Sequence, residues 1–459
     1  MNINRLLENS KRTSLIGKNL YTFEGYSNGH WSEPMCGLSA KPERGCSIYG
    51  VCIGHQIENL TYAVVPEFYE NEKKLEFLSV RHRWTPAWQE TYYRSTPDAE
   101  YYSKSGCISF RETKCITAND VFVSEIVISS DKRETTQLRV KLNSPIEGAY
   151  SFDIKIGALG QNISSTVFTC VKNTVSDCNE FLLQIPPNGQ VSFRYVFGLS
   201  KKDMETAEKL IENALKTKNP FEENEKQFNA FIAENAPEFV TENFDILKIY
   251  YYRWFLVWRA HHKPSEIIEN HPIPSDCFYE SPYGSWYGAP VGLPVPLHVE
   301  ETKWMKNSSW CKTNAENWIK GITNYREYIQ YTPIALWHFY QNHQDKDFLE
   351  RAYSACFDYS LGHFNLENEG LDFFKTLNSS WSTGAEYQPA FYQHTMVKWD
   401  WSQDAEGMAA GTATETLAIY RLDRIVYAIG CLIGCKEMAK ELEKNRRRKV
   451  LFYTYRSFD

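Results

Sequence analysis

The 459-residue sequence predicts a multidomain α+β protein with an N-terminal antiparallel β-sandwich, a helical linker and a C-terminal α/α toroid. Three observations predict this fold class. Apolar residues alternate with period two up to about residue 200, they follow a helical period from residue 201, and tryptophan is concentrated late in the chain. Of the thirteen Trp, only Trp31, Trp84 and Trp88 precede residue 254. We therefore place the sandwich at residues 1–200, the linker at 201–240 and the toroid at 241–459.

Composition narrows the possible partners. The net charge of −7 and the pI of about 6.0 do not favour binding to a phosphate backbone, so no nucleic-acid partner is expected. The N-terminus lacks an apolar run long enough for a signal peptide, and no later run approaches a membrane span. We expect a cytoplasmic protein without a membrane partner, and the sequence does not predict its oligomeric state.

The twelve cysteines are scattered and form no paired motif at zinc-site spacing, so neither a metal nor a cofactor is predicted. We interpret them as reduced thiols of a cytoplasmic protein. Cys36 and Cys46 could form a disulfide in an oxidising compartment. Cys431 and Cys435 lie one helical turn apart without a histidine at ligand spacing, which favours core thiols over metal ligands.

Short apolar runs rich in Val, Ile, Phe and Tyr, separated by turn-forming residues, predict the strands of the sandwich. These runs lie at residues 48–53, 60–68, 75–80, 121–128, 137–142, 150–156, 166–171, 181–185 and 191–197. The segment P-P-N-G-Q at 186–190 predicts the turn between the last two.

The later part of the chain predicts helices. Residues 201–216 and 222–234 would form the linker, with Asn219-Pro220 ending the first of these helices. Residues 243–262 are apolar on most helical faces, which predicts a buried helix. A loop at 263–296 precedes helices at 298–306 and 309–325, a hairpin of 333–343 and 345–364 joined at Gln344 with Asp345 as an N-cap, and a last helix at 414–444. Long loops between paired helices are the layout of an α/α toroid.

The stretch 381–407 carries the strongest chemical signal. Glu386 follows Gly384 and is surrounded by Trp381, Tyr387 and Phe391. Aromatic faces stack on the apolar faces of sugar rings, and a carboxyl group in partly apolar surroundings can hold a raised pKa and act as a general acid. This predicts a sugar-cleaving site. The alternative is a buried aromatic loop between two helices.

Three features resemble the six-hairpin (α/α)6-barrel glycosidases, especially the trehalase-like bacterial group that includes glycoside hydrolase family 63. The first is the order of parts, with a sandwich ending in P-P-N-G-Q-V-S-F-R-Y-V-F-G before the helical linker. The second is Y-E-S-P-Y-G-S-W-Y-G-A-P-V-G-L-P-V-P-L-H-V-E-E-T-K-W, which is similar to the first site-lining loop and the helix after it. The third is S-T-G-A-E-Y-Q-P-A-F-Y, where many relatives carry Asp in place of Glu386. The resemblance covers about residues 20–444.

The resemblance implies an inverting glycoside hydrolase acting on a small oligosaccharide or glycoside, with Glu386 as the general acid. The two site-like stretches, 279–306 and 381–407, supply the candidate substrate-binding residues: Trp286, Tyr287, Glu300, Glu301, Trp304, Trp381, Tyr387, Gln388, Asp400 and Trp401. Glu300 and Glu301 could instead be a solvated helix start, and Asp400 could be a helix cap.

An inverting glycosidase also needs a carboxylate that activates water, and in the resembled families it lies late in the toroid. Twelve helices with loops need on the order of 350 residues at roughly a dozen residues per helix, more than residues 241–459 supply. The sequence thus predicts a partial (α/α)6 toroid without its base. The closing segment N-R-R-R-K-V-L-F-Y-T-Y-R-S-F-D breaks the helical pattern, which suggests a truncated or frame-shifted product.

Three functions other than hydrolysis are also considered for this sequence. A catalytically inactive carbohydrate-binding protein would have the same architecture. A phosphorylase needs a phosphate cradle, and no Gly-rich or Arg-bearing segment stands out near 381–407. An epimerase would use paired histidines such as His298 and His394, although each of these is more often structural.

Overall fold

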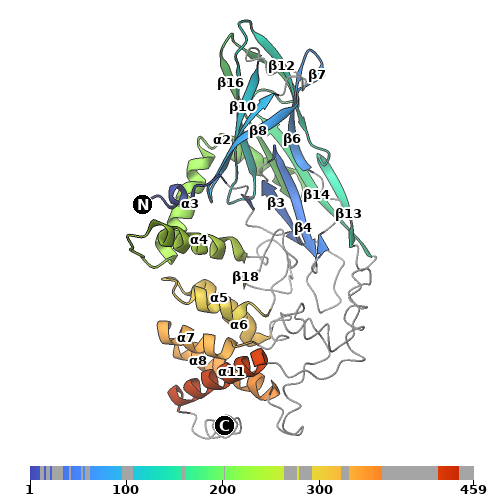
Figure 1. The fold of residues 1–459 in the computed structure, drawn as a ribbon. Coiled ribbons are helices and arrows are strands. Elements are labelled where there is room, and N and C mark those ends of the chain that lie inside the picture. Colours follow the sequence, from blue (N-terminus) through green and yellow to red (C-terminus); the bar gives the residue numbers. More distant parts are fainter. Residues whose placement is uncertain are drawn as a thin grey trace, which may run out of the picture.

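The structure is a computed structural model. It describes residues 1–10, 15–16, 21–22, 35–40, 43–52, 55–56, 62–95, 107–156, 161–200, 202–262, 277–278, 292–321, 330–363 and 422–443. After a short helix α1 (Ile3–Leu7), antiparallel strands continue to Ser200, and the later elements are mainly helices (Figure 1). The predicted α+β class is confirmed in this form. The closed ring of a toroid and the predicted domain boundaries stay predictions.

The strands of the described residues form two large antiparallel sheets. One has the order β1-β3-β4-β6-β12-β15, with β2, β5 and β7 pairing beside this path, and the other has the order β13-β14-β16-β11-β10-β9-β8. Strands β1 to β8 are Leu15–Ile16, Tyr21–Thr22, Met35–Ala40, Cys46–Cys52, His55–Gln56, Tyr62–Glu70, Lys73–Lys74 and Phe77–Trp84. Strands β9 to β16 are Gln89–Ser95, Ile108–Ile116, Phe122–Ser130, Thr136–Asn143, Gly148–Ile156, Gln161–Asn173, Glu180–Ile185 and Gln190–Ser200.

Aromatic side chains join the facing surfaces of the two sheets. The ring centroids of Phe68 on β6 and Phe110 on β10 are 4.9 Å apart, and those of Phe181 on β15 and Phe193 on β16 are 5.3 Å apart. Strand β12 buries every second residue, including Leu138 and Val140. This alternation is the period-two pattern that predicts strands.

The predicted runs do not include β3, β9 or β10, and β10 shows one reason. Its inner face carries the fully buried charges Glu112 and Lys114 where the pattern calls for apolar residues. Glu112 Oε1 accepts hydrogen bonds from the Tyr195 hydroxyl (2.8 Å) and the Gly45 amide (3.2 Å). Lys114 Nζ donates to the carbonyls of Gly45 (3.0 Å) and Glu43. Burial lowers the pKa of Lys114. The two charges hold the turn before β4 against the opposite sheet.

Helix α2 (Met204–Lys216) covers the outer face of the second sheet. Asp203 caps it by accepting from the Thr206 amide (2.7 Å). A side-chain carbon at Gly198 on β16 would lie 2.9 Å from Ile211 Cγ1, so only glycine allows this close approach.

The remaining helices largely follow the predicted positions. They are α3 (Pro220–Asn235), α4 (Phe244–Ala260), α5 (Val295–Thr302), α6 (Ser309–Lys320), α7 (Thr332–His343), α8 (Lys346–His363) and α11 (Leu422–Glu441). Asn219 is the N-cap of α3 and Pro220 is its first residue. This pair therefore begins α3 as well as ending α2. Helix α5 begins earlier than predicted because Pro294, Val295 and Pro296 form its start. The predicted cap is confirmed, since Asp345 Oδ1 accepts from the Phe348 amide (2.9 Å).

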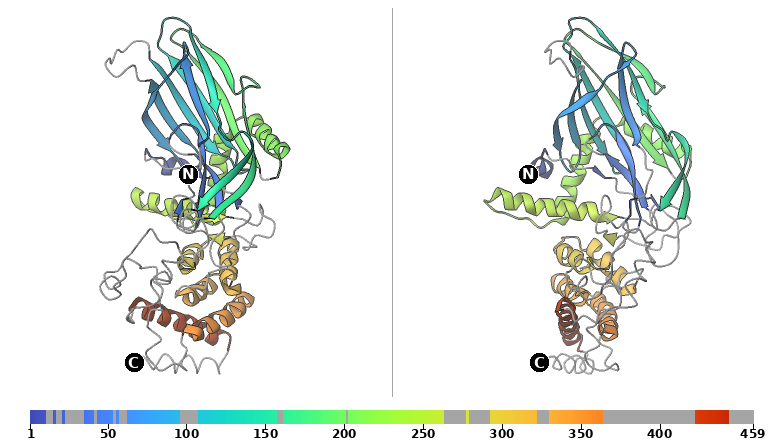
Figure 2. Two further views of the ribbon diagram at one scale, coloured as in Figure 1. Left: turned by 90° about the vertical axis from the view of Figure 1, so that its right-hand side faces the viewer. Right: turned by 45° about the vertical axis from the view of Figure 1, so that its right-hand side comes forward.

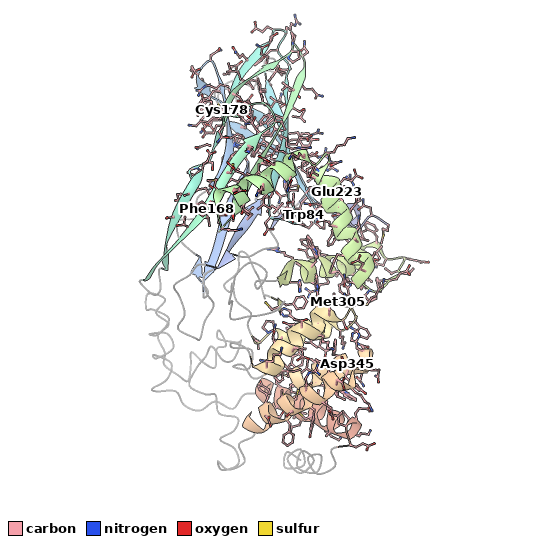
Figure 3. All side chains as sticks on the ribbon, turned by 180° about the vertical axis from the view of Figure 1, so that it is seen from behind. Trp84, Phe168, Cys178, Glu223, Met305 and Asp345 are labelled. Atoms are coloured by element: carbon pink, nitrogen blue, oxygen red, sulfur yellow. The ribbon has the colours of Figure 1, made fainter. Side chains whose placement is uncertain are left out.

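The helices after α2 divide between two hydrophobic cores. Helices α3 and α4 share the core of the sheets, whereas α5, α6, α7, α8 and α11 form a second one. Trp84, at the end of β8, lies edge-on to Phe255 of α4 (5.1 Å). Phe231 of α3 stacks on Trp310 of α6 (5.2 Å), which links the two cores. Figure 3 shows Trp84 at the sheet end and Met305 between α4 and the lower helices.

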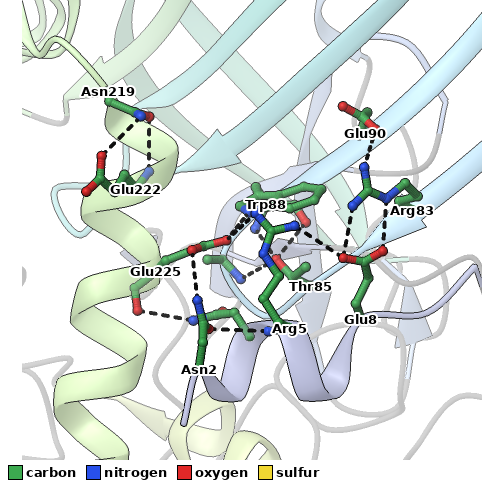
Figure 4. A network of polar contacts seen from close by, with 12 residues as sticks. Asn2, Arg5, Glu8, Arg83, Thr85, Trp88, Glu90, Asn219, Glu222 and Glu225 are labelled. Carbon is green, nitrogen blue, oxygen red and sulfur yellow. Dashed lines mark hydrogen bonds and ion pairs between the residues drawn. The ribbon is translucent and has the colours of Figure 1, made fainter.

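Trp88, in the turn between β8 and β9, is the centre of a polar network that ties α1 and α3 to the second sheet (Figure 4). Its indole Nε1 donates to Glu225 of α3 (2.7 Å). The guanidinium carbons of Arg5 and Arg83 lie 5.5 and 5.4 Å from the Trp88 ring. Arg83 also forms a bidentate pair with Glu8, at 2.9 and 3.0 Å.

Replacing Glu225 should destabilise the chain. Glu225→Ala leaves the indole N–H of Trp88 without its acceptor in a buried setting, which costs about 1–3 kcal/mol. Chemical denaturation of the full chain measures this. Glu223→Ala is the matched control on α3, because Glu223 is exposed and its pair with the exposed Lys226 contributes little, so its effect should stay within about 0.5 kcal/mol. Equal midpoints for the two variants would contradict the role of Glu225.

Helix α11 packs closely on the first turn of α7 through two glycines. A side-chain carbon at Gly434 would lie 2.5 Å from backbone atoms of Pro333 and Ile334, whereas one at Gly430 would meet Tyr331 Cβ at an ordinary 3.4 Å.

These distances predict opposite effects for two alanine substitutions. Gly434→Ala should destabilise by about 1–3 kcal/mol because the backbone of α7 must move. Gly430→Ala should be neutral or stabilising by up to about 1 kcal/mol, since alanine favours the helix. Thermal unfolding of both variants checks this, and similar melting temperatures would contradict the close packing at Gly434.

Candidate functional site

Three of the predicted site residues lie in the described part of the chain, at the end of α5 and in the turn after it: Glu300, Glu301 and Trp304. The other predicted site residues lie outside the described residues: Trp286, Tyr287, Trp381, Glu386, Tyr387, Gln388, Asp400 and Trp401. Within the described residues, the candidate site therefore lies around the end of α5.

Helix α5 is oriented by its apolar face. Val295, Val299 and Thr302 are buried, at the three- and four-residue spacing of one helical face. The helix ends where the Lys303 amide donates to the Val299 carbonyl (2.8 Å). Burial of this face leaves Glu300 only partly buried, and its carboxylate is turned toward α7.

Both carboxylate oxygens of Glu300 have partners. His338 Nδ1, from the middle of α7, lies 2.6 Å from Oε1, and Lys303 Nζ contacts Oε2. The imidazole donates when its proton is on Nδ1. Because both oxygens receive hydrogen bonds, Glu300 is suited to accept hydrogen bonds rather than to donate a proton.

Tyr331 is the N-cap residue of α7. Burial raises its pKa to about 12, with a further contribution from Glu300. Its ring centroid is 5.5 Å from that of Tyr427 on α11. A neutral phenol hydroxyl can donate and accept hydrogen bonds, which suits recognition of sugar hydroxyls.

Glu301 faces α4. Arg253 holds it through two parallel hydrogen bonds, from Nε to Oε1 (2.7 Å) and from Nη2 to Oε2 (2.8 Å). This bidentate pair fixes α5 against α4 and leaves Arg253 half exposed. In this position Glu301 is a structural partner as well as a candidate hydroxyl acceptor.

Trp304 presents an exposed indole, with 57% of the residue accessible. Lys303 Nζ lies 5.1 Å from its ring centroid. The turn that carries it is anchored, because the Lys303 carbonyl accepts from His343 Nε2 (2.8 Å). An exposed, anchored indole one helical turn beyond Glu300 is the pairing of aromatic face and carboxylate that sugar binding requires.

His298 lies on the other side of α5, with its ring centroid 5.4 Å from that of Phe278. Its Nδ1 is buried, and no described residue forms a hydrogen bond with it. Burial lowers the pKa of the imidazole to about 4, and the positive charge of Arg253 adds to this. The ring is therefore neutral at physiological pH.

A two-stranded ladder precedes α5 in the chain. Strands β17 (His261–His262) and β18 (Cys277–Phe278) pair antiparallel. The His261 ring stacks flat on Trp310 at 3.5 Å. The ladder pairs His262 with Cys277, and Phe278 lies beside His298 and Trp310 of α6.

The sequence did not predict His338 or Arg253 as partners of the site. His338 is a single histidine within an ordinary helical pattern, and Arg253 is one cation in an apolar helix. Arg253 reaches Glu301 because α4 packs against α5, and His338 reaches Glu300 because α7 packs against α5.

Among the described residues, no cluster of three or more His, Cys, Asp or Glu side chains could hold a metal ion. Cys431 and Cys435 are buried free thiols, and Cys46 is also free. None of the described helices is long and apolar enough to cross a membrane.

No family model and no curated protein matches this chain. Among solved structures, a protein described as a kojibiose phosphorylase from the human microbiome is similar at 11% identity and a TM-score of 0.45, covering 94% of this chain and 67% of that one. A family GH92 alpha-mannosidase from Bacteroides thetaiotaomicron is similar at 8% identity and a TM-score of 0.32, covering 99% and 64%.

The chain thus spans about two thirds of the length of each of these proteins. Both likenesses are weak in sequence and in shape. Neither protein is described as a family 63 glycosidase, so the resemblance to that family stays a prediction.

The neutral His298 predicts a pH dependence of folding. Its pKa falls from about 6.5 in the unfolded chain to about 4 in the folded one, so the unfolded state binds the proton first. The free energy of unfolding is therefore highest above pH 6.5. It decreases as the pH falls toward 4, by up to about 3 kcal/mol. Urea denaturation of the native chain and of His298→Phe between pH 4.5 and 7 measures it. The variant should lose part of the pH dependence, and identical pH profiles would contradict the prediction.

Proposed function

We propose that this chain is a carbohydrate-active protein whose reaction is glycosidic bond hydrolysis with inversion, acting on a small oligosaccharide or glycoside. The observation that supports it best is the end of α5, where the Glu300 carboxylate is oriented by His338 and Lys303 beside the exposed indole of Trp304. The order of the chain, with antiparallel sheets followed by aromatic-rich helices, also supports it.

In this proposal the α5 end is a sugar subsite. Trp304 offers its ring to the apolar face of a pyranose, and Glu300 accepts hydrogen bonds from ring hydroxyls. His338 keeps the carboxylate in place, because a carboxylate held by two donors loses little further freedom when the sugar binds.

Glu386 has the catalytic role in the proposal. As the general acid it donates its proton to the glycosidic oxygen, so that the leaving sugar departs as a neutral alcohol. A water molecule attacks the anomeric carbon from the opposite face and loses its proton to a carboxylate that we do not assign.

A carbohydrate-binding protein without turnover is the second candidate. One observation favours it: both oxygens of Glu300, and both of Glu301, already receive hydrogen bonds from side chains of the chain itself. Such carboxylates can recognise hydroxyls without acting as acids.

Hydrolysis of aryl glycosides and disaccharides by the full chain tests the catalytic role. Glu386→Gln should lower turnover by about 10²–10⁴-fold, the contribution of general acid catalysis, while folding is unchanged. Glu406→Gln is the matched control from the same stretch and should keep native turnover. Full activity of Glu386→Gln would dismiss Glu386 as the acid.

Binding measurements separate the two candidates. Trp304→Ala should weaken sugar binding by at least about tenfold, ~1.4 kcal/mol, in titration calorimetry. Leu297→Ala, an equally exposed apolar residue of α5, should leave binding unchanged. Binding without release of reducing ends would favour the second candidate, and no sugar binding at all would refute both.

A further inference from the structure

Helix α4 has two apolar faces, although only one of them is buried. Tyr251, Trp254 and Phe255 pack into the core. On another side, Ile246, Ile249 and Tyr252 are 48%, 62% and 40% exposed. A helix with apolar residues on both sides is normally covered on both sides, and the sequence indeed predicts burial of this segment.

The exposed residues form one narrow stripe. At 100° per residue, the positions of Tyr252, Asp245, Ile249, Arg253 and Ile246 fall within about 120° of arc, away from the core. The right-hand view of Figure 2 shows α4 extending beyond the neighbouring helices. We call these five residues the α4 stripe.

The α4 stripe is complementary to itself. If a second copy of α4 lies antiparallel with a two-fold axis at Ile249, the position three residues before the axis meets the position three residues after it. Ile246 then faces Tyr252 of the second copy, and Ile249 faces Ile249. Four residues from the axis, Asp245 faces Arg253, so opposite charges meet at both ends.

We propose that the α4 stripe is the interface of a two-fold symmetric dimer of this chain. Arg253 holds Glu301 through Nε and Nη2, so Nη1 is the nitrogen that would donate to Asp245 of the second copy. The three apolar residues form the centre of the contact and the two charges its rim, the arrangement found in protein interfaces. Because one helix pair is a small contact, the dimer forms reversibly.

Sedimentation velocity of the full chain at increasing concentration tests the dimer. The native chain should pass from monomer to dimer. Ile249→Asp should raise the dissociation constant by at least about tenfold, ~1.4 kcal/mol, with an unchanged circular dichroism spectrum because Ile249 is 62% exposed. Val426→Asp is the matched control, an apolar residue of α11 with 55% exposure, and should dimerise like the native chain.

Cross-linking tests the position of the axis. Ile249→Cys treated with a short bismaleimide should give a covalent dimer, whereas Val426→Cys and the native chain, with its own exposed Cys178, should stay at the background level. A native chain that is monomeric at every concentration overturns the proposal. Equal effects of Ile249→Asp and Val426→Asp also overturn it, since the contact would then lie elsewhere.

Discussion

The arrangement of the helices depends on one line of aromatic contacts between the sheets and the helical part. Trp84 at the end of β8 contacts Phe255 of α4, Phe255 lies 6.0 Å from Phe228 of α3, and Phe231 of α3 stacks on Trp310 of α6. Each ring removes a large apolar area from water and has a preferred geometry to its neighbour. This line therefore sets both the position and the angle of α6, and of α5 that precedes it.

The fold class could be predicted because both periodicities are strong in this sequence. Strands such as β12 bury every second residue, and α5 buries Val295, Val299 and Thr302 on one face. Strand β10 departs from this apolar periodicity. Glu112 and Lys114 replace apolar residues on its inner face, and their burial depends on Tyr195 and Gly45, which are distant in sequence. The local sequence of β10 does not indicate which distant residues will form hydrogen bonds with these buried charges.

The candidate site also combines residues that the sequence predicts with partners that it does not. Glu300, Glu301 and Trp304 could be proposed from the sequence because they lie in the second of the segments that resemble the six-hairpin glycosidases. Their partners His338 and Arg253 could not, because each comes from another helix and carries no local signal. The pairing also changes the interpretation of the two glutamates. Carboxylates held by donors are fitted to recognition, which leaves proton transfer to a residue outside this group, as the proposal for Glu386 requires.

The contact between α1 and α3 has a consequence for the order of events during synthesis. Asn4 of α1 donates to the Glu225 carbonyl of α3 (3.1 Å), across 221 positions of sequence. Helix α1 thus leaves the ribosome before α3 and has no native neighbour there until 221 more residues have followed. During that interval Ile3, Leu6 and Leu7, buried in the finished protein, have no complete apolar site to enter. Chains grow at about 5–20 residues per second, so this exposure lasts on the order of ten seconds or more. Nascent chains of this protein should therefore bind chaperones until α3 has emerged.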